Sequence, residues 1–136
     1  MAHTKFRAEV LTPEGEVFND EVEMVSTKTA VGSIGILANH EPVLAMLDPT
    51  ELRLYKTESE CVRFAQAEGY LQMAENRVLI LVEEASAPGD LDASSLRERL
   101  QQAERELESA GDDSEKRRVA ERDKNRLETF LGIAEG

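Results

Sequence analysis

The sequence predicts an α+β protein, with an antiparallel β-sandwich at the amino-terminal end and a hairpin of two helices at the carboxy-terminal end. Before residue 88, apolar residues alternate with polar ones, and turn signals recur at short intervals. After residue 90, the apolar residues recur at helical spacings and no proline occurs. Between these regions, Pro88 and Gly89 follow a run of small residues, which is typical of a linker. We therefore expect a sandwich domain over 1–87 and a helical hairpin domain over 88–136.

Half-buried strands are predicted by a period of two. Phe6, Ala8 and Val10 alternate with charged residues, and Leu52 and Leu54 alternate with longer polar or amphipathic ones. Residues 78–82 are apolar on both sides of the predicted strand, so the side that faces away from the core needs a cover. The helical tail and a partner subunit are the two candidates for that cover.

Residues 32–47 contain two glycines, an Asn-His-Glu-Pro turn and two short apolar runs, a pattern that predicts strand, loop and strand. Gly32 and Gly35 lie inside the first strand pattern, where glycine predicts a bulge or a close approach of another backbone. Asn39 tolerates a left-handed conformation, and Pro42 is expected to end the turn.

The first helix is predicted by an apolar stripe in an otherwise charged segment: Leu96, Leu100, Ala103 and Leu107. Asp92 or Ser94 can cap its start, and Gly111 is expected to end it.

A second helix is expected to begin around Ser114. Its apolar stripe is thinner and consists of Val119, Ala120, Leu127, Phe130 and Leu131. Because packing of the apolar face supplies most of a helix's stability in a protein, we expect the two helices to separate readily.

The composition of the chain argues against several functions. The 28 acidic and 16 basic residues give a net charge of -12, which argues against binding to nucleic acid or to an anionic lipid surface. Cys61 is the single cysteine, and no apolar segment resembles a signal peptide or a membrane span. We expect a soluble chain that reaches a membrane only through another protein.

Catalytic chemistry has few candidates in this sequence. His3 and His40 are the two histidines, and Cys61 has no histidine near it in the sequence, which is too few ligands for a zinc site. No serine lies in a G-x-S-x-G context, and no phosphate-binding loop of the G-x-x-x-x-G-K type is present. The sequence therefore predicts a protein that is not an enzyme and holds no metal or cofactor.

One segment resembles a known family. Residues 32–37, Gly-Ser-Ile-Gly-Ile-Leu, followed by residues 39–44, Asn-His-Glu-Pro-Val-Leu, resemble the signature of the epsilon subunit of F-type ATP synthases. Residues 12–15, residues 68–71 and the charged helical tail lie where that family has similar elements. The resemblance spans nearly the whole chain.

The resemblance implies a central-stalk rotor subunit of a bacterial, proton-translocating complex, peripheral on the cytoplasmic side of the plasma membrane. It assigns contacts with the gamma subunit to four residues: His40, Val43, Ala45 and Met46. It assigns contacts with the membrane-embedded c-ring to Gly32, Ser33 and Ile34. Ser33 stands where many relatives carry glutamate, so the resemblance implies no specific ion pair with the ring at that position.

The family's tail switches between a compact hairpin and an extended form that meets the alpha and beta subunits and restrains ATP hydrolysis. Residues 114–131 hold six basic and four acidic side chains. The resemblance assigns the inhibitory contact with an acidic segment of the beta subunit to the basic ones: Lys116, Arg117, Arg118, Arg122, Lys124 and Arg126. The alternative is a solvated helix face with pairs of opposite charge four residues apart.

Two further alternatives stay open at this stage. Some relatives bind ATP through an (I/L)-D-x-x-R-A motif, of which this chain keeps Leu91 and Asp92 but has Ser95 and Leu96 in place of arginine and alanine. Asp92 is thus the single candidate for nucleotide binding and serves equally as a helix cap. The chain as a whole also fits a stand-alone adaptor whose hairpin binds an acidic protein.

Overall fold

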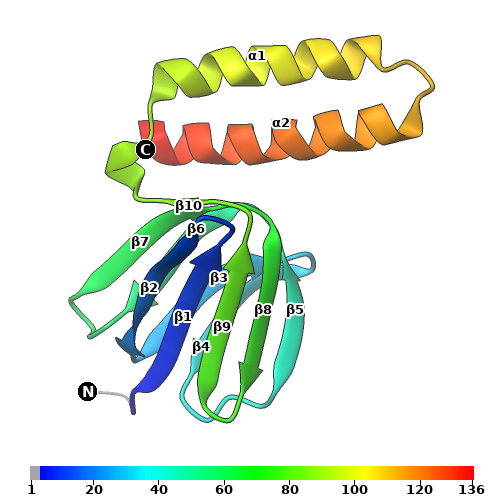
Figure 1. The fold of residues 1–136 in the computed structure, drawn as a ribbon. Helices are drawn as coiled ribbons and strands as arrows, with labels where there is room; N and C mark the ends of the chain where they lie inside the picture. The colour runs from blue at the N-terminus through cyan, green and yellow to red at the C-terminus, as the bar shows by residue number, and fades with distance from the viewer. Residues whose placement is uncertain (1–3) are drawn as a thin grey trace. The chain divides into compact units, whose positions relative to one another are not determined.

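The computed structural model describes residues 4–136, which form two compact units that divide between Ala87 and Pro88 (Figure 1). The first unit consists of strands: β1 (Phe6–Thr12), β2 (Gly15–Val22), β3 (Met24–Thr29), β4 (Gly32–Leu37), β5 (Val43–Leu47), β6 (Thr50–Tyr55), β7 (Cys61–Gln66), β8 (Gly69–Ala74), β9 (Arg77–Val82) and β10 (Ala85–Ser86). The second consists of helices: the 3-10 turn η1 (Pro88–Asp90), α1 (Ala93–Ser109) and α2 (Ser114–Glu135).

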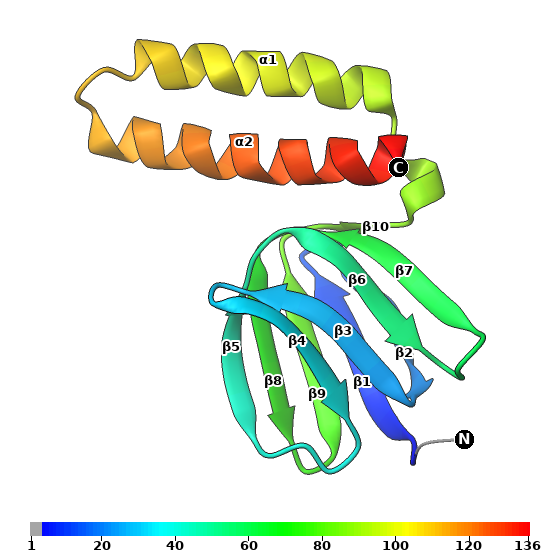
Figure 2. The ribbon, with the colours of Figure 1, turned by 180° about the vertical axis from the view of Figure 1, so that it is seen from behind.

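The strands form a sheet of 10 strands in the order β10-β7-β6-β3-β5-β8-β9-β1-β2, with β4 paired to β3. Seen from both sides, the sheet curls into two layers, with β5, β8, β9 and β1 in one and β7, β6, β3 and β4 in the other (Figures 1 and 2). The predicted sandwich and helix pair are confirmed. One pair departs from the antiparallel expectation, because β1 and β9 run parallel. They are far apart in sequence, which leaves the long connection that parallel pairing requires.

The core lies between the two layers and is built by alternation along the strands. β1 buries Phe6, Ala8 and Val10, and β6 buries Leu52 and Leu54, as the period of two predicts. In β9, Val78, Ile80 and Val82 are buried, whereas Leu81 remains exposed on the opposite side.

The expected bulge at Gly32 and Gly35 is not present. The pairing of β3 with β4 runs without a shift from Met24 opposite Leu37 to Thr29 opposite Gly32. Gly32 instead closes the turn between these strands with a φ of 134° that glycine adopts without strain. The predicted left-handed conformation of Asn39 is confirmed by its φ of 65°, and β5 begins directly after Pro42.

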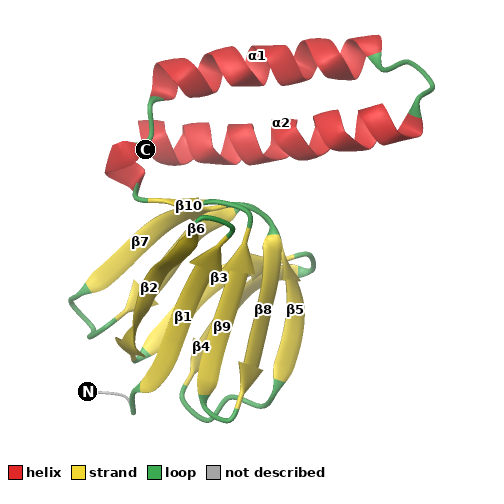
Figure 3. Ribbon diagram, in the orientation of Figure 1, coloured by secondary structure: helices red, strands yellow, loops and turns green. Residues whose placement is uncertain are grey.

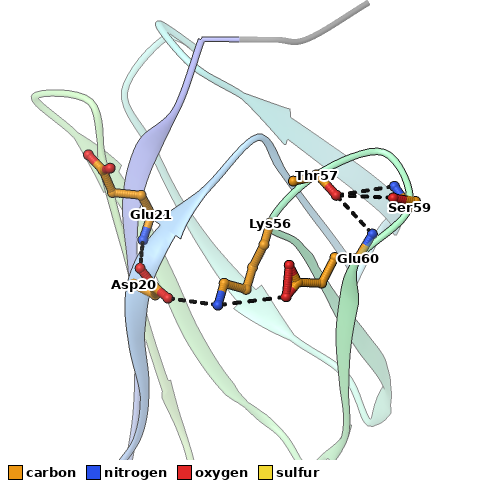
Figure 4. Close-up of polar contacts among 6 residues, drawn as sticks. All are labelled: Asp20, Glu21, Lys56, Thr57, Ser59 and Glu60. Carbon is orange, nitrogen blue, oxygen red and sulfur yellow. Dashed lines mark hydrogen bonds and ion pairs between the residues drawn. The ribbon is translucent and has the colours of Figure 1, made fainter.

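A charged cluster ties the edge strand β2 to the β6–β7 hairpin (Figure 4). Lys56 Nζ lies 3.0 Å from Asp20 Oδ2 and 3.9 Å from Glu60 Oε2. The same carboxylate of Asp20 accepts a hydrogen bond from the backbone N–H of Glu21 at 2.7 Å. Thr57 Oγ1 accepts from the backbone N–H of Glu60 and so holds the hairpin turn that carries Glu60.

Both helices begin at an aspartate (helices are red in Figure 3). The carboxylate of Asp92 accepts hydrogen bonds from the backbone N–H groups of Ser94 and Ser95, so Asp92 rather than Ser94 caps α1. Asp113 caps α2 by accepting from the N–H of Lys116. Gly111 has a φ of 54°, the left-handed conformation expected just after a helix ends.

Candidate interaction surfaces

Side chains alternate along β5, so the residues predicted to contact gamma differ in their exposure. Leu44 and Met46 point away from the core, with 74% and 62% of their surface exposed. Val43 packs against the core, and Ala45 lies on the same inward side because side chains two apart in a strand share a face. Of the four predicted contacts, therefore, His40 and Met46 are exposed, whereas Val43 and Ala45 are half-buried. Leu44, which the prediction omitted, is the most exposed residue of the strand.

The exposed apolar surface continues across the neighbouring strands. In β8, Tyr70 lies opposite Met46, and in β9, Leu81 lies opposite Tyr70. Tyr70 is 52% exposed and Leu81 is 43% exposed. We call Leu44, Met46, Tyr70 and Leu81 the outer face. A row of large apolar side chains on adjacent strands is unusual on a protein that works alone and marks a site of interaction.

A shallow hollow of about 300 Å³ adjoins the outer face, lined by Leu11, Pro13, Gly69, Tyr70, Leu81 and Val82 among others. Among these residues, Gly69 cannot be replaced without a steric clash. A Cβ atom built on Gly69 would lie 2.0 Å from the backbone oxygen of Leu81, so only glycine allows β8 and β9 to pair at this point.

The residues predicted to contact the c-ring lie at the start of β4. Ser33 is exposed, and Gly32 is half-buried in the turn that precedes it. Ile34 is partly buried and packs against the core, so it supports the turn from within and contributes less surface to a partner.

His40 lies in the exposed connection between β4 and β5. Its ring nitrogen Nδ1 lies 2.8 Å from the backbone oxygen of Glu41, which makes Nδ1 the protonated nitrogen, and its backbone N–H donates to Leu37 O. The turn is further held by Asn76, whose Oδ1 accepts from the backbone N–H of Asn39 at 2.7 Å. His40 is thus a turn residue on the surface, and His3 lies outside the described residues.

Carboxylates of α2 neutralise part of its positive charge. Arg118 donates to Glu115 through both Nε and Nη2, at 3.2 and 2.6 Å. These hydrogen bonds hold the pKa of Glu115 below its usual value. Two weaker pairs follow, Arg117 with Glu121 at 3.7 Å and Arg122 with Asp123 at 3.3 Å. The pair of Arg117 with Glu121 has the spacing of four residues that the alternative interpretation, a solvated helix face, predicts.

The basic side chains of α2 also differ in exposure. Lys116, Arg117, Arg118 and Arg122 are exposed, while Lys124 and Arg126 are half-buried. The first two turns of the helix therefore present most of its accessible positive charge.

The surface between α1 and α2 is hollowed partway along the hairpin. A hollow of about 380 Å³ is lined by the buried Ala103 and Leu127 together with five polar residues: Arg99, Gln102, Glu106, Asp123 and Arg126. At the base of the hairpin, Arg97 of α1 forms an ion pair with Glu135 of α2. Asp92, the candidate for nucleotide, does not line this hollow and uses its carboxylate as the cap of α1.

Neither a metal site nor a membrane span is found in the part of the chain that the structure describes. Over residues 4–136, histidine, cysteine, aspartate and glutamate side chains form no group of three or more that could hold a metal ion. Over the same range, neither helix combines the length and the apolar character needed to cross a bilayer.

The described residues thus form a β-sandwich with an exposed apolar row and, as a separate unit, a helical hairpin. Residues 5–88 match the family model described as ATP synthase, delta/epsilon chain, beta-sandwich domain. The chain belongs to the ATP synthase epsilon chain family.

Similarity to epsilon chains extends beyond the sandwich. The ATP synthase epsilon chain of Sulfurihydrogenibium sp. is 31% identical over 129 residues, which cover 95% of this chain and 96% of the relative. That of Persephonella marina is 38% identical over 127 residues, 93% of each chain. Among solved structures, a chain of the Euglena gracilis mitochondrial ATP synthase, in a structure of OSCP, F1 and the c-ring, has a TM-score of 0.76 at 21% identity. The match covers 97% of this chain and 82% of the Euglena chain, and this likeness supports the fold alone.

Proposed function

We propose that this chain is the non-catalytic central-stalk subunit of a bacterial, proton-translocating F-type ATP synthase, bound at the cytoplasmic side of the plasma membrane through the complex. In this role it links the gamma subunit to the c-ring and turns with them. The observation that carries the proposal is the outer face, because four large apolar side chains on three adjacent strands need a protein partner to leave water.

The gamma subunit is the partner we assign to the outer face. The resemblance of residues 32–44 to epsilon chains supports this assignment, because it brings the strand that carries Leu44 into the gamma contact. Leu44 and Met46 lie on β5, which pairs with β8 along its whole length from Val43 to Leu47. A pre-formed, rigid apolar row of this kind loses little conformational entropy on binding.

The helical hairpin restrains ATP hydrolysis when it extends toward the alpha and beta subunits. Two observations support a hairpin that can open: the hollow between α1 and α2, and the position of the accessible positive charge in the first turns of α2. Because the pairs within α2 are exposed, an acidic partner can replace them at little cost. A partner that binds the extended form more tightly shifts the population toward it.

The test is the ATPase rate of the reconstituted complex with the full chain and with a chain that ends at Gly111. The truncated chain keeps the sandwich, so we expect it to co-purify with gamma and to give a higher rate of hydrolysis. Replacing Arg117, Arg118, Arg122 and Arg126 with alanine is expected to reproduce part of the rise. An unchanged rate in the truncated complex would show that the hairpin does not inhibit hydrolysis. Failure of the full chain to co-purify with gamma would favour a stand-alone adaptor.

A further inference from the structure

The turn between β8 and β9 has an unusual backbone. It consists of Glu75 and Asn76, which follow one another in the left-handed region with φ of 50° and 60°. A two-residue hairpin turn of this kind most often carries asparagine followed by glycine, because glycine adopts the conformation without strain. Here glutamate stands at the first position, where a left-handed backbone is strained, and asparagine stands at the second. Asparagine in the place of glycine points to a role for its side chain.

The side chain of Asn76 reaches a second turn, the connection from β4 to β5 (residues 38–42). Its Oδ1 accepts a hydrogen bond from the backbone N–H of Asn39 at 2.7 Å, across 37 positions of the sequence. The ends of β4, β5, β8 and β9 show that the two turns lie at the same end of the sandwich (Figures 1 and 2). Asn39 is itself left-handed, with a φ of 65°. One side-chain oxygen thus joins two turns that are far apart in the sequence.

The other hydrogen bonds of the β4–β5 connection are local. The backbone N–H of His40 donates to Leu37 O at 3.2 Å, and His40 Nδ1 lies 2.8 Å from Glu41 O. Residues 39–42 are exposed, so the core does not hold them. The hydrogen bond from Asn39 is the one that ties these exposed residues to a different pair of strands.

The same hydrogen bond lies where it can fix the start of β5. The pairing of β5 with β8 ends with Val43 opposite Met73, and the bond from Asn39 to Asn76 lies beyond that pair. Leu44, the first outward-facing residue of β5, comes directly after Val43. A surface that is held in its binding conformation before the partner arrives loses less entropy on binding.

We propose that Asn76 is a positioning residue for the contact with the gamma subunit. It acts through Asn39: by holding the β4–β5 connection against the β8–β9 turn, it keeps His40 and the start of β5 in one conformation. The proposal rests on the proposed function, which assigns gamma to the outer face, and it adds a residue that lies outside that face. Loss of the hydrogen bond leaves the sandwich folded, because the bond joins two turns outside the core.

Three variants separate the hydrogen-bond acceptor from the turn that carries it. Asn76→Gly removes Oδ1 and leaves a left-handed backbone free of strain, so the turn itself is kept. Asn76→Asp keeps an oxygen at the same position and tolerates the conformation. Glu75→Gly is the matched control, because it changes the neighbouring residue of the same turn and leaves the acceptor in place.

Two measurements are made on each full-length variant after circular dichroism has verified its fold. Amide hydrogen exchange, followed by NMR on the free chain, reports whether the N–H of Asn39 is held. Titration with purified gamma at about 0.5 M salt gives the dissociation constant under conditions that screen the charge of Asn76→Asp. We expect Asn76→Gly to speed exchange at Asn39 at least about tenfold and to weaken gamma binding at least about threefold. Asn76→Asp and Glu75→Gly are expected to match the wild type in both measurements.

Three results would overturn the positioning role. They are exchange at Asn39 that stays at the wild-type rate in Asn76→Gly, gamma binding that stays at wild-type strength although exchange has risen, and an equal loss of binding in Asn76→Asp or Glu75→Gly. Failure of the proposed function looks different, because the wild-type chain itself then does not bind gamma. In that case the positioning of a gamma contact is wrong as well, while the exchange rates still show whether Asn76 holds the connection.

Discussion

At the residue scale, single residues determine where neighbouring strands of the sheet meet. Gly69 allows β8 to approach β9, and Lys56 joins β2 to the β6–β7 hairpin. The buried amide of Gln66 accepts from Thr27 Oγ1 at 2.6 Å and donates to the backbone oxygen of Asp48, so its polar atoms are satisfied inside the sandwich. None of these pairings is visible in the sequence, because each joins residues that only the folded sheet brings together.

Asp20 is expected to make stability depend on pH. The N–H of Glu21 and the ammonium of Lys56 hold the pKa of Asp20 below its ordinary value. A carboxyl whose pKa is lower in the folded state stabilises the fold above its unfolded pKa of about 3.9, and this contribution is lost as the pH falls through the folded pKa. Asp20→Asn keeps an oxygen for Glu21 but loses the charge, so it should unfold at a lower temperature than the wild type at pH 7.

The gap between the two unfolding temperatures should narrow as the pH falls below about 3.9 and close once the pH is below the lowered pKa of Asp20 in the folded protein. Thermal unfolding followed by circular dichroism at a series of pH values measures it. A gap of the same size at neutral and acidic pH would mean that the ion pair with Lys56 does not contribute to stability.

At the element scale, the period of the apolar residues was a sufficient guide to the type of each element, but the face of a strand depends on its neighbours. Alternation in β5 places Val43 inward and Leu44 outward, yet both are apolar, so the sequence alone does not decide which of them faces the core. The parallel pairing of β1 with β9 likewise leaves no local signal.

The hairpin is expected to depend on a few buried side chains. Leu127 is 4% exposed and borders the hollow between the helices, so little neighbouring packing compensates for its loss. Leu127→Ala should destabilise the hairpin by about 2–5 kcal/mol, whereas the exposed neighbour Glu128→Ala should change it by no more than about 0.5 kcal/mol. Urea unfolding monitored by helical circular dichroism measures both, and equal effects of the two variants would contradict the assigned packing.

At the scale of the whole molecule, the sequence supplied the division into two units, the fold class and the family. The candidate surfaces were less predictable, because exposure depends on the completed sheet: Leu44, Tyr70 and Val31 are apolar residues that the sequence cannot distinguish from the core. The six basic residues of α2 were found from charge alone, while their partial neutralisation by carboxylates of the same helix required the structure.

The central claim, that the outer face binds the gamma subunit, is tested most directly by the affinity of the full chain for purified gamma. Leu44→Asp places a charge in the centre of the proposed contact, and the control Val17→Asp places it at an exposed valine of β2. With the fold of both variants verified by circular dichroism, we predict that Leu44→Asp raises the dissociation constant at least about tenfold and that Val17→Asp leaves it unchanged. A folded Leu44→Asp chain that binds gamma as tightly as the wild type would contradict the account.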